Sequence, residues 1–260
     1  MNILEEIAGR TKERIRQKKM ILPLSGLRKE AEKKEKPLSF EAALRQPELS
    51  FICEVKKASP SKGVIAEDFP YAKIAREYEK AGAAAISCLT EPYWFQGRDS
   101  YLRQIAKVVS IPVLRKDFTI DEYMIYEAKE MGASAVLLIC GILDDSQLKA
   151  YGQLAGELGL LALVEAHSRE EVERAMKAGA GIIGVNNRDL RTFQVDIDNS
   201  VRLRKMVPPE IPFVSESGIR TAADMKRLYE NGTDAVLIGE TLMRAVDKKA
   251  AFAELRGGMV

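Results

Sequence analysis

The segment LLALVEAHSREEVERAMKAGAGIIGVNN (160–187) contains the unit that decides the fold. Its ends, LLALVEA (160–166) and GIIGVNN (181–187), are short apolar runs, and a longer polar stretch separates them. Apolar residues at successive positions indicate a strand that is buried on both faces, as in a parallel sheet. Two parallel strands need a crossover between them, usually a helix. The segment therefore predicts a β-α-β unit.

The same kind of apolar run recurs along the chain. Besides the two quoted runs, others occupy residues 50–56, 84–90, 111–117, 134–140, 212–217 and 234–240. Helical patterns lie between the runs. In TAADMKRLYENG (221–232), Ala222, Met225 and Leu228 recur at helical spacing, and Gly232 follows as the helix end. Three other glycines end helices shortly before a strand, and these are Gly82, Gly132 and Gly179.

Eight strands joined by right-handed crossovers close into a barrel more readily than they form an open sheet. We therefore predict an α/β protein in which residues 50–260 form a (β/α)8 TIM barrel. A doubly wound sheet is the alternative, but no G-x-G-x-x-G turn follows the first strand. Residues 1–49 are expected to be an N-terminal helical extension of the same domain, 1–260. Within it, Ile3, Ile7 and Ile15 predict one amphipathic helix, and RKEAEKKEK (28–36) predicts a solvated helical face.

Composition limits the class of protein. The chain is 46% apolar, and its 40 basic and 38 acidic residues leave a net charge of +2, so no electrostatic argument favours nucleic acid or an anionic membrane. No apolar run approaches the ~20 residues of a membrane span, and the N-terminus does not resemble a secretory signal. Cys53, Cys88 and Cys140 lie in strand-like runs, which indicates buried thiols and neither disulfides nor a zinc site. We expect a cytoplasmic protein.

Charged and polar residues stand where the buried strands end. Side chains alternate along a strand, so Glu54 and Lys56 share one face. The third strand ends in Arg115-Lys116-Asp117, the fifth in Glu165, the sixth in Asn186-Asn187-Arg188 and the seventh in Glu216-Ser217. Ion pairing with a neighbour at the solvent-exposed end of the barrel could explain one such residue. Polar residues from five strands that converge at one barrel mouth favour an active site instead. A lysine there can act as a general acid and a glutamate as a general base.

Two glycines predict a phosphate site. Gly218 and Gly239 stand at the strand-to-helix steps after the seventh and eighth strands, where this fold often binds phosphate. Ser59 begins a hydroxyl-rich loop, SPSKG (59–63), for which an ordinary turn is the simpler interpretation. Phe95 and Phe118 lie in loops and could line an aromatic substrate. The single histidine, His167, is expected to be an ordinary loop residue.

Several motifs resemble those of the indole-3-glycerol phosphate synthase family. The resemblance covers all eight predicted strands, the loop TEPYWFQG (90–97) and the N-terminal helix. The strand-end motifs are CEVKKASPSKG (53–63), PVLRKDF (112–118), LVEAHS (163–168), IGVNNRDL (183–190), VSESGI (214–219) and VLIGETLM (236–243).

The resemblance implies a carbon–carbon lyase of tryptophan biosynthesis. Its substrate, 1-(o-carboxyphenylamino)-1-deoxyribulose 5-phosphate, is cyclised to indole-3-glycerol phosphate with loss of carbon dioxide and water. By similarity, Lys116 is the general acid, Glu165 is the base of the dehydration, Lys56 assists as acid or binds the substrate carboxylate, and Glu54 orients the lysines. Asn186, Arg188, Glu216 and Ser217 would hold hydroxyl and carboxylate groups. Ser59, Gly218, Gly239 and Glu240 would line the phosphate site, and Phe95 and Phe118 would flank the anthranilate ring.

The implied reaction needs no metal and no cofactor, because it combines acid–base chemistry with anion binding and has no redox step. The only expected partner is the small anionic sugar phosphate, and a monomer would suffice. Glu240 is acidic beside the phosphate site, so its side chain should point away. Two other functions stay open: a phosphosugar aldolase that forms a Schiff base through Lys116 or Lys56, and a non-catalytic subunit that binds sugar phosphates.

Overall fold

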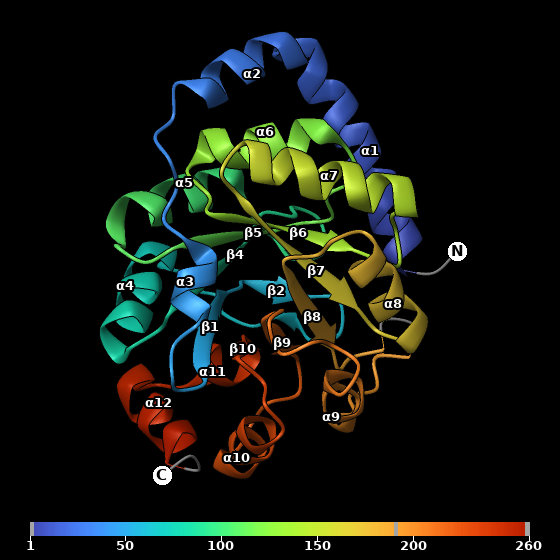
Figure 1. The fold of residues 1–260 in the computed structure, drawn as a ribbon. Coiled ribbons are helices and arrows are strands. Elements are labelled where there is room, and N and C mark those ends of the chain that lie inside the picture. Colours follow the sequence, from blue (N-terminus) through green and yellow to red (C-terminus); the bar gives the residue numbers. More distant parts are fainter. Residues whose placement is uncertain (1–2, 190–191, 258–260) are drawn as a thin grey trace.

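Eight parallel strands close into a barrel in the computed structural model, which describes residues 3–189 and 192–257 (Figure 1). Each predicted apolar run contains one strand, and β1 pairs with both β10 and β4 to close the ring. The (β/α)8 TIM barrel is therefore confirmed. The strands are β1 (Ser50–Val55), β4 (Ala85–Leu89), β5 (Val113–Lys116), β6 (Ala135–Ile139), β7 (Leu161–Ala166), β8 (Ile182–Asn186), β9 (Phe213–Glu216) and β10 (Ala235–Ile238).

Alternation along the strands creates two apolar layers. On β1, Cys53 and Val55 face outward into the layer between the strands and the helices, whereas Ile52 faces the barrel interior. Ile7 joins the interior cluster from the N-terminal helix, and Phe40 and Leu44 join it from α3 (Phe40–Leu44). Because both layers are apolar, the strands needed apolar residues at successive positions. All three cysteines are buried and free, as predicted.

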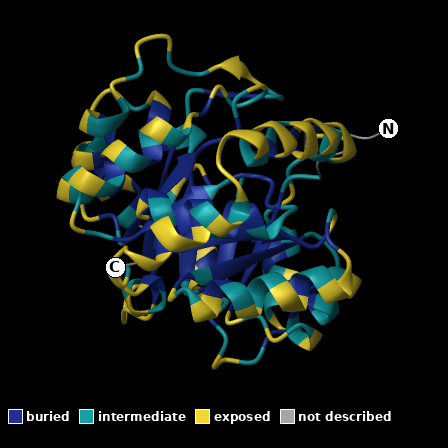
Figure 2. Ribbon diagram, turned by 90° about the horizontal axis from the view of Figure 1, so that it is seen from above, coloured by how far each residue is buried: buried dark blue, intermediate teal, exposed yellow. Residues whose placement is uncertain are grey.

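Helices surround the barrel, with exposed residues on their outer sides and buried strands inside the ring (Figure 2). The predicted helix over 221–232 is α10, which begins after Thr221 with a capping box to Asp224 and ends before Gly232. Gly82, Gly132, Gly179 and Gly232 all have φ between 77° and 104°, a region in which a side chain is strained. The helices are α4 (Tyr71–Ala81), α5 (Asp99–Val108), α6 (Glu122–Met131), α7 (Asp145–Glu157), α8 (Arg169–Lys177), α9 (Asp198–Arg204), α10 (Ala222–Glu230), α11 (Glu240–Arg244) and α12 (Lys248–Arg256).

The N-terminal residues form α1 (Ile3–Ile21), α2 (Leu24–Glu32) and α3 before the first strand. Helix α1 buries Ile7 and Ile15 as its pattern predicts. The charged run 28–36 is helical only as far as Glu32, so that expectation was wrong for its last four residues. Lys33 already caps the helix, and the restriction at the position before Pro37 accounts only for Lys36.

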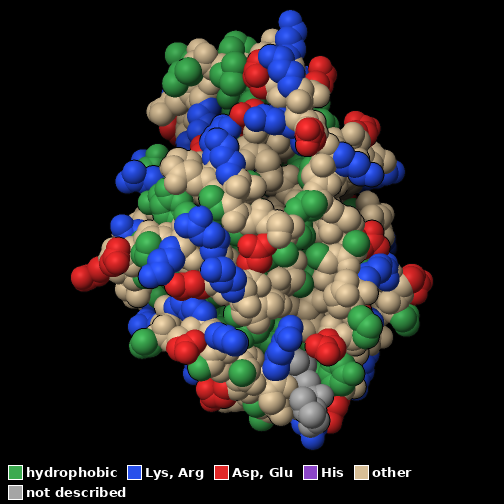
Figure 3. All heavy atoms as spheres, turned by 90° about the vertical axis from the view of Figure 1, so that its left-hand side faces the viewer, with side chains coloured by type: hydrophobic (Ala, Val, Ile, Leu, Met, Phe, Trp, Pro, Cys, Tyr) green, Lys and Arg blue, Asp and Glu red, His purple; other side chains and the backbone are tan. Residues whose placement is uncertain are grey.

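The charge distribution on the surface and the apolarity of the helices complete the description of the fold. Basic and acidic side chains are interspersed on the face that Figure 3 presents, which fits the balanced composition. Among the helices that the structure describes, none has the length and apolarity needed to cross a membrane.

Candidate active site

A pocket of about 410 Å³ lies at the carboxyl end of the barrel, and every residue to which the family resemblance assigns a role contributes to its lining. All eight barrel strands and several of the loops that follow them contribute to the lining, so residues far apart in the sequence meet there. The residues of the predicted site are Glu54, Lys56, Ser59, Phe95, Lys116, Phe118, Glu165, Asn186, Arg188, Glu216, Ser217, Gly218, Gly239 and Glu240.

Lys116 occupies the centre of the charged group. Its Nζ lies 2.8 Å from Glu216 Oε2 and 3.2 Å from Glu165 Oε2. Burial alone would lower the pKa of Lys116, but the carboxylates of Glu216, Glu165 and Glu54 outweigh burial and raise it. Lys116 is therefore an ammonium ion at neutral pH, the form that a proton donor needs.

The two carboxylates that share Lys116 differ in their surroundings. Burial raises the pKa of Glu216 to about 7 against the opposing effect of Lys116. Burial also acts on Glu165, but Lys116, His167 and a hydrogen bond from Asn186 prevail and lower the pKa of Glu165. At neutral pH, Glu165 is thus ionised, whereas Glu216 is partly protonated.

Lys56, directly after β1, forms a second charged pair with Glu54 of that strand, as expected of residues two positions apart in extended backbone. Both side chains approach the backbone of Gly239, where a Cβ atom would collide with the Glu54 carboxylate. Glycine is therefore required at 239 for the pair to fit. The structure pairs Glu54 with Lys56, whereas Glu165 and Glu216 hold Lys116.

The predicted phosphate side lies between the ends of β9 and β10. Ser217 and Gly218 have φ of 69° and 83°, and Gly239 precedes the first turn of α11. Thr241 joins the two loops through a 2.8 Å hydrogen bond from its hydroxyl to the Ile219 carbonyl. The carboxylate of Glu240 lies 3.2 Å from Arg244 Nε and 3.8 Å from Lys62 Nζ, so these cations neutralise the acid.

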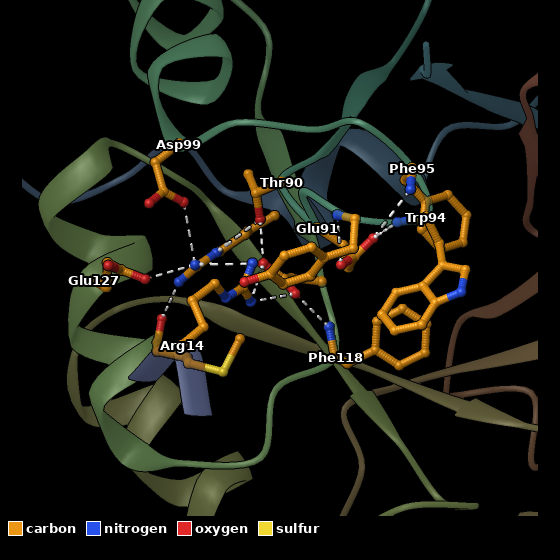
Figure 4. A network of polar contacts seen from close by, with 12 residues as sticks. Arg14, Thr90, Glu91, Trp94, Phe95, Asp99, Phe118 and Glu127 are labelled. Atoms are coloured by element: carbon orange, nitrogen blue, oxygen red, sulfur yellow. Dashed lines mark hydrogen bonds and ion pairs between the residues drawn. The ribbon is translucent and has the colours of Figure 1, made fainter. Parts of the chain in front are cut away.

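Phe95 and Phe118 form an aromatic wall, with ring centroids 6.1 Å apart. A residue that sequence reasoning missed supports this wall (Figure 4). The buried carboxylate of Glu91 accepts hydrogen bonds from the backbone N–H groups of Tyr93, Trp94 and Phe95, at 2.8 to 3.0 Å. Its signal in the sequence was an acid between a buried strand and an aromatic loop.

Phe118 is fixed by a second network in the same view. Its backbone N–H donates to Asp117 Oδ1 at 2.8 Å, and Asp117 also accepts from Thr90 at 2.6 Å and from Arg14 of α1. Buried polar groups need such partners. The N-terminal helix therefore reaches the site both through Arg14 and through Ile7, which lines the pocket.

Two polar residues at strand ends do not belong to the pocket, contrary to the expectation that they face the barrel mouth. Arg115 is fully buried on the outer face of β5, where its guanidinium pairs with Glu127 at 2.6 Å and with Asp99 at 3.4 Å. Asn187 donates to Ser215 Oγ and to the Ser217 carbonyl, also behind the barrel. Side-chain alternation explains both positions, since their neighbours Lys116 and Asn186 face the pocket.

Some remaining predictions concern the loops. Ser59 lies in a short hairpin formed by β2 (Ala58–Ser59) and β3 (Gly63–Val64), so the loop is indeed a tight turn, although it also lines the pocket. His167 follows β7 as a loop residue but contacts Glu165, which was not anticipated. Leu190, the last residue of the motif IGVNNRDL, lies outside the described residues. Within the described residues, no three His, Cys, Asp or Glu side chains form a group suited to a metal ion.

Fold and pocket together define a class of protein: a TIM-barrel enzyme with a buried cluster of paired lysines and glutamates at its carboxyl mouth. Residues 4–255 match the family model described as indole-3-glycerol phosphate synthase. The chain belongs to this family, as its motifs indicate, and the expected carboxy-lyase of tryptophan biosynthesis is confirmed at the level of the family.

Individual relatives support the same assignment. An indole-3-glycerol phosphate synthase of Ruminiclostridium cellulolyticum is 58% identical over 98% of this chain and 99% of the relative. One from Lacticaseibacillus casei is 53% identical over 97% of this chain and 99% of the relative. Among solved structures, 3-hexulose-6-phosphate synthase of Salmonella typhimurium has a TM-score of 0.67 at 15% identity, covering 81% of this chain and 98% of its own. At that identity the likeness shows the fold alone.

Proposed function

We propose that this pocket converts 1-(o-carboxyphenylamino)-1-deoxyribulose 5-phosphate into indole-3-glycerol phosphate, with Lys116 as the general acid. The observation that carries the proposal is the ammonium group of Lys116, held between Glu165 and Glu216 in a pocket with one aromatic wall and one glycine-rich side. The ammonium group supports proton transfer. The aromatic wall fits the anthranilate ring, and the glycine-rich side fits the phosphate.

In the first step, the ring carbon that bears the carboxylate attacks the ribulose carbonyl. Negative charge develops on the carbonyl oxygen, and the Lys116 ammonium donates a proton to it. The carbon–carbon bond to the carboxylate then breaks. Carbon dioxide leaves, and the bonding electrons return to the ring, which becomes aromatic again.

The second step removes water. The new hydroxyl group departs after it receives a proton from a lysine. Lys56, which pairs with Glu54, would supply this proton. Glu165 accepts the proton that the new five-membered ring gives up. Its lowered pKa keeps it ionised and ready as the base.

The remaining polar groups of the pocket would bind the substrate. Asn186, Arg188 and Ser217 would hold hydroxyl and carboxylate groups, while Ser59, Gly218 and Gly239 would surround the phosphate. The compartment that suits three buried reduced thiols is the cytoplasm. A single chain contributes every residue that this mechanism uses, so the proposed working unit is a monomer.

The appearance of indole fluorescence on adding the proposed substrate tests the activity directly. Lys116→Ala should lower kcat by about 10²- to 10⁴-fold, the usual contribution of a general acid. Lys107→Ala, on the outer helix α5, is a matched control and should leave kcat unchanged. Binding of inorganic phosphate should survive in both variants. Undiminished turnover by Lys116→Ala would exclude the acid role.

The aldolase alternative needs an uncharged lysine, because only the free amine attacks a carbonyl. Three carboxylates keep Lys116 charged, which argues against that chemistry. Borohydride treatment in the presence of substrate separates the two mechanisms. We expect no covalent adduct on Lys116 or Lys56.

A further inference from the structure

The only histidine of the chain lies directly behind Glu165 and has no role in the steps above. His167 Nε2 is 3.6 Å from Glu165 Oε1, and its Nδ1 is 3.4 Å from Glu171 Oε2. The backbone of His167 is fixed as well. Its N–H donates to Glu171 Oε2 at 2.6 Å, and its carbonyl accepts from Asn199 Nδ2 at 3.1 Å. The imidazole therefore lies between two carboxylates, and its buried Nε2 makes no hydrogen bond among the described residues, so its effect on Glu165 is one of charge.

This placement distinguishes the two carboxylates that share Lys116. Glu165 has His167 and the Asn186 amide beside its Oε1, the latter at 3.3 Å. The corresponding oxygen of Glu216, Oε1, is buried and has no hydrogen-bond partner among the described residues. When environments separate two acids in this way, the ionised one takes the role of base.

We propose that His167, held by Glu171, is a positioning residue that keeps Glu165 ionised and fixed beside Lys116, so that Glu165 and not Glu216 serves as the base. The inference rests on the proposed function. Its physical reason lies in the first step, in which Lys116 gives away its proton and its charge. His167 is then the cation that remains next to Glu165. Without it, Glu165 and Glu216 would share the available proton more evenly.

The charged groups around the imidazole agree with this role. Glu165 faces it from β7, Glu171 faces it from α8, and Glu216 acts on it from β9, while α9 contributes the neutral Asn199. Burial alone would lower the pKa of His167, but these acids raise it above its ordinary value. His167 is therefore charged below that raised pKa, and it loses the charge as pH rises through it.

The pH profile of kcat/KM tests the proposal. Removal of a positive charge raises the pKa of Glu165, so the acidic limb of His167→Gln should move to higher pH. Below the limb, activity should fall about tenfold for each pH unit by which the limb moves. KM at high pH should hardly change, because His167 does not line the pocket. His167→Lys restores a cation and should move the limb back. Glu173→Gln, on the exposed side of α8, is the control.

A second measurement uses the fact that the chain has one histidine. The imidazole resonance of ¹³C-labelled histidine can be followed by NMR without assignment, and it should titrate above the ordinary value of about 6.5. Glu171→Gln should lower the midpoint. A wild-type midpoint at or below about 6.5 overturns the proposal, as does an acidic limb of His167→Gln that coincides with the wild type. An inactive wild-type enzyme would instead refute the proposed function.

Discussion

Replacement of Glu216 by glutamine should change how stability depends on pH. Burial raises the pKa of Glu216 from 4.5 to about 7 in the folded protein. Between these two values the unfolded chain releases the proton while the native protein keeps it, so the native state is favoured at low pH and loses this advantage as pH rises through 7. A pKa difference of about 2.5 between the two states, at about 1.36 kcal/mol for each pH unit, corresponds to about 3 kcal/mol.

The assay is equilibrium unfolding in urea at a series of pH values from about 4.5 to about 8. The free energy of unfolding of the wild type, minus that of Glu216→Gln, should fall by about 3 kcal/mol across this range. The glutamine carbonyl can still accept from Lys116, which limits other effects of the change. Glu173→Gln provides the comparison for the loss of one exposed carboxylate. A wild-type minus Glu216→Gln difference that is constant with pH would refute the reasoning.

Three further substitutions test other parts of the structure. Gly184→Ala places a Cβ against the Glu216 carboxylate, so it should lower stability by about 1–3 kcal/mol and reduce kcat. Gly152→Ala, with open space around it, should not lower stability, and equal effects of the two substitutions in urea unfolding would contradict this. Glu91→Gln loses a charged acceptor for three backbone N–H groups, so it should lower the free energy of unfolding by about 1–3 kcal/mol and raise KM more than it lowers kcat. An unchanged KM would contradict the role of Glu91 behind Phe95. Thr221→Ala breaks the capping box of α10 and should lower stability by about 1 kcal/mol with kcat intact; an unaltered urea midpoint would contradict the capping argument.

Local periodicity made most of the fold predictable. A strand between two apolar layers must be apolar at successive positions, and this property is visible in 134–140 or 160–166 without any knowledge of the rest of the chain. Helix ends were visible for a similar reason, because Gly82 and Gly132 adopt backbone angles that other residues avoid. Glu91 was noticeable only as an acid between a strand and an aromatic loop. Its role was not predicted, because its partners are backbone groups of a loop whose path depends on the whole barrel.

The end of β5 shows why the site could be predicted only in part. The residues Val113 and Leu114 are both apolar, so their sequence does not reveal which of them faces the barrel interior. The following three residues are all charged, and the choice between Lys116 and its two neighbours therefore depends on the register of the sheet. In the structure Leu114 and Lys116 face inward, which sends Arg115 outward to Glu127 and Asp99.

The pairing of charges within the pocket depends on still longer-range geometry. Proximity in sequence correctly joins Glu54 to Lys56, because two residues on one strand face lie side by side. It offers no means of choosing partners for Lys116, which meets Glu165 and Glu216 across the barrel. Those two glutamates look alike in the sequence, and the imidazole behind one of them helps to give them different charges at neutral pH. A histidine two residues after a strand-end glutamate, with another acid four residues further on, is therefore the sequence feature that distinguishes Glu165 from Glu216.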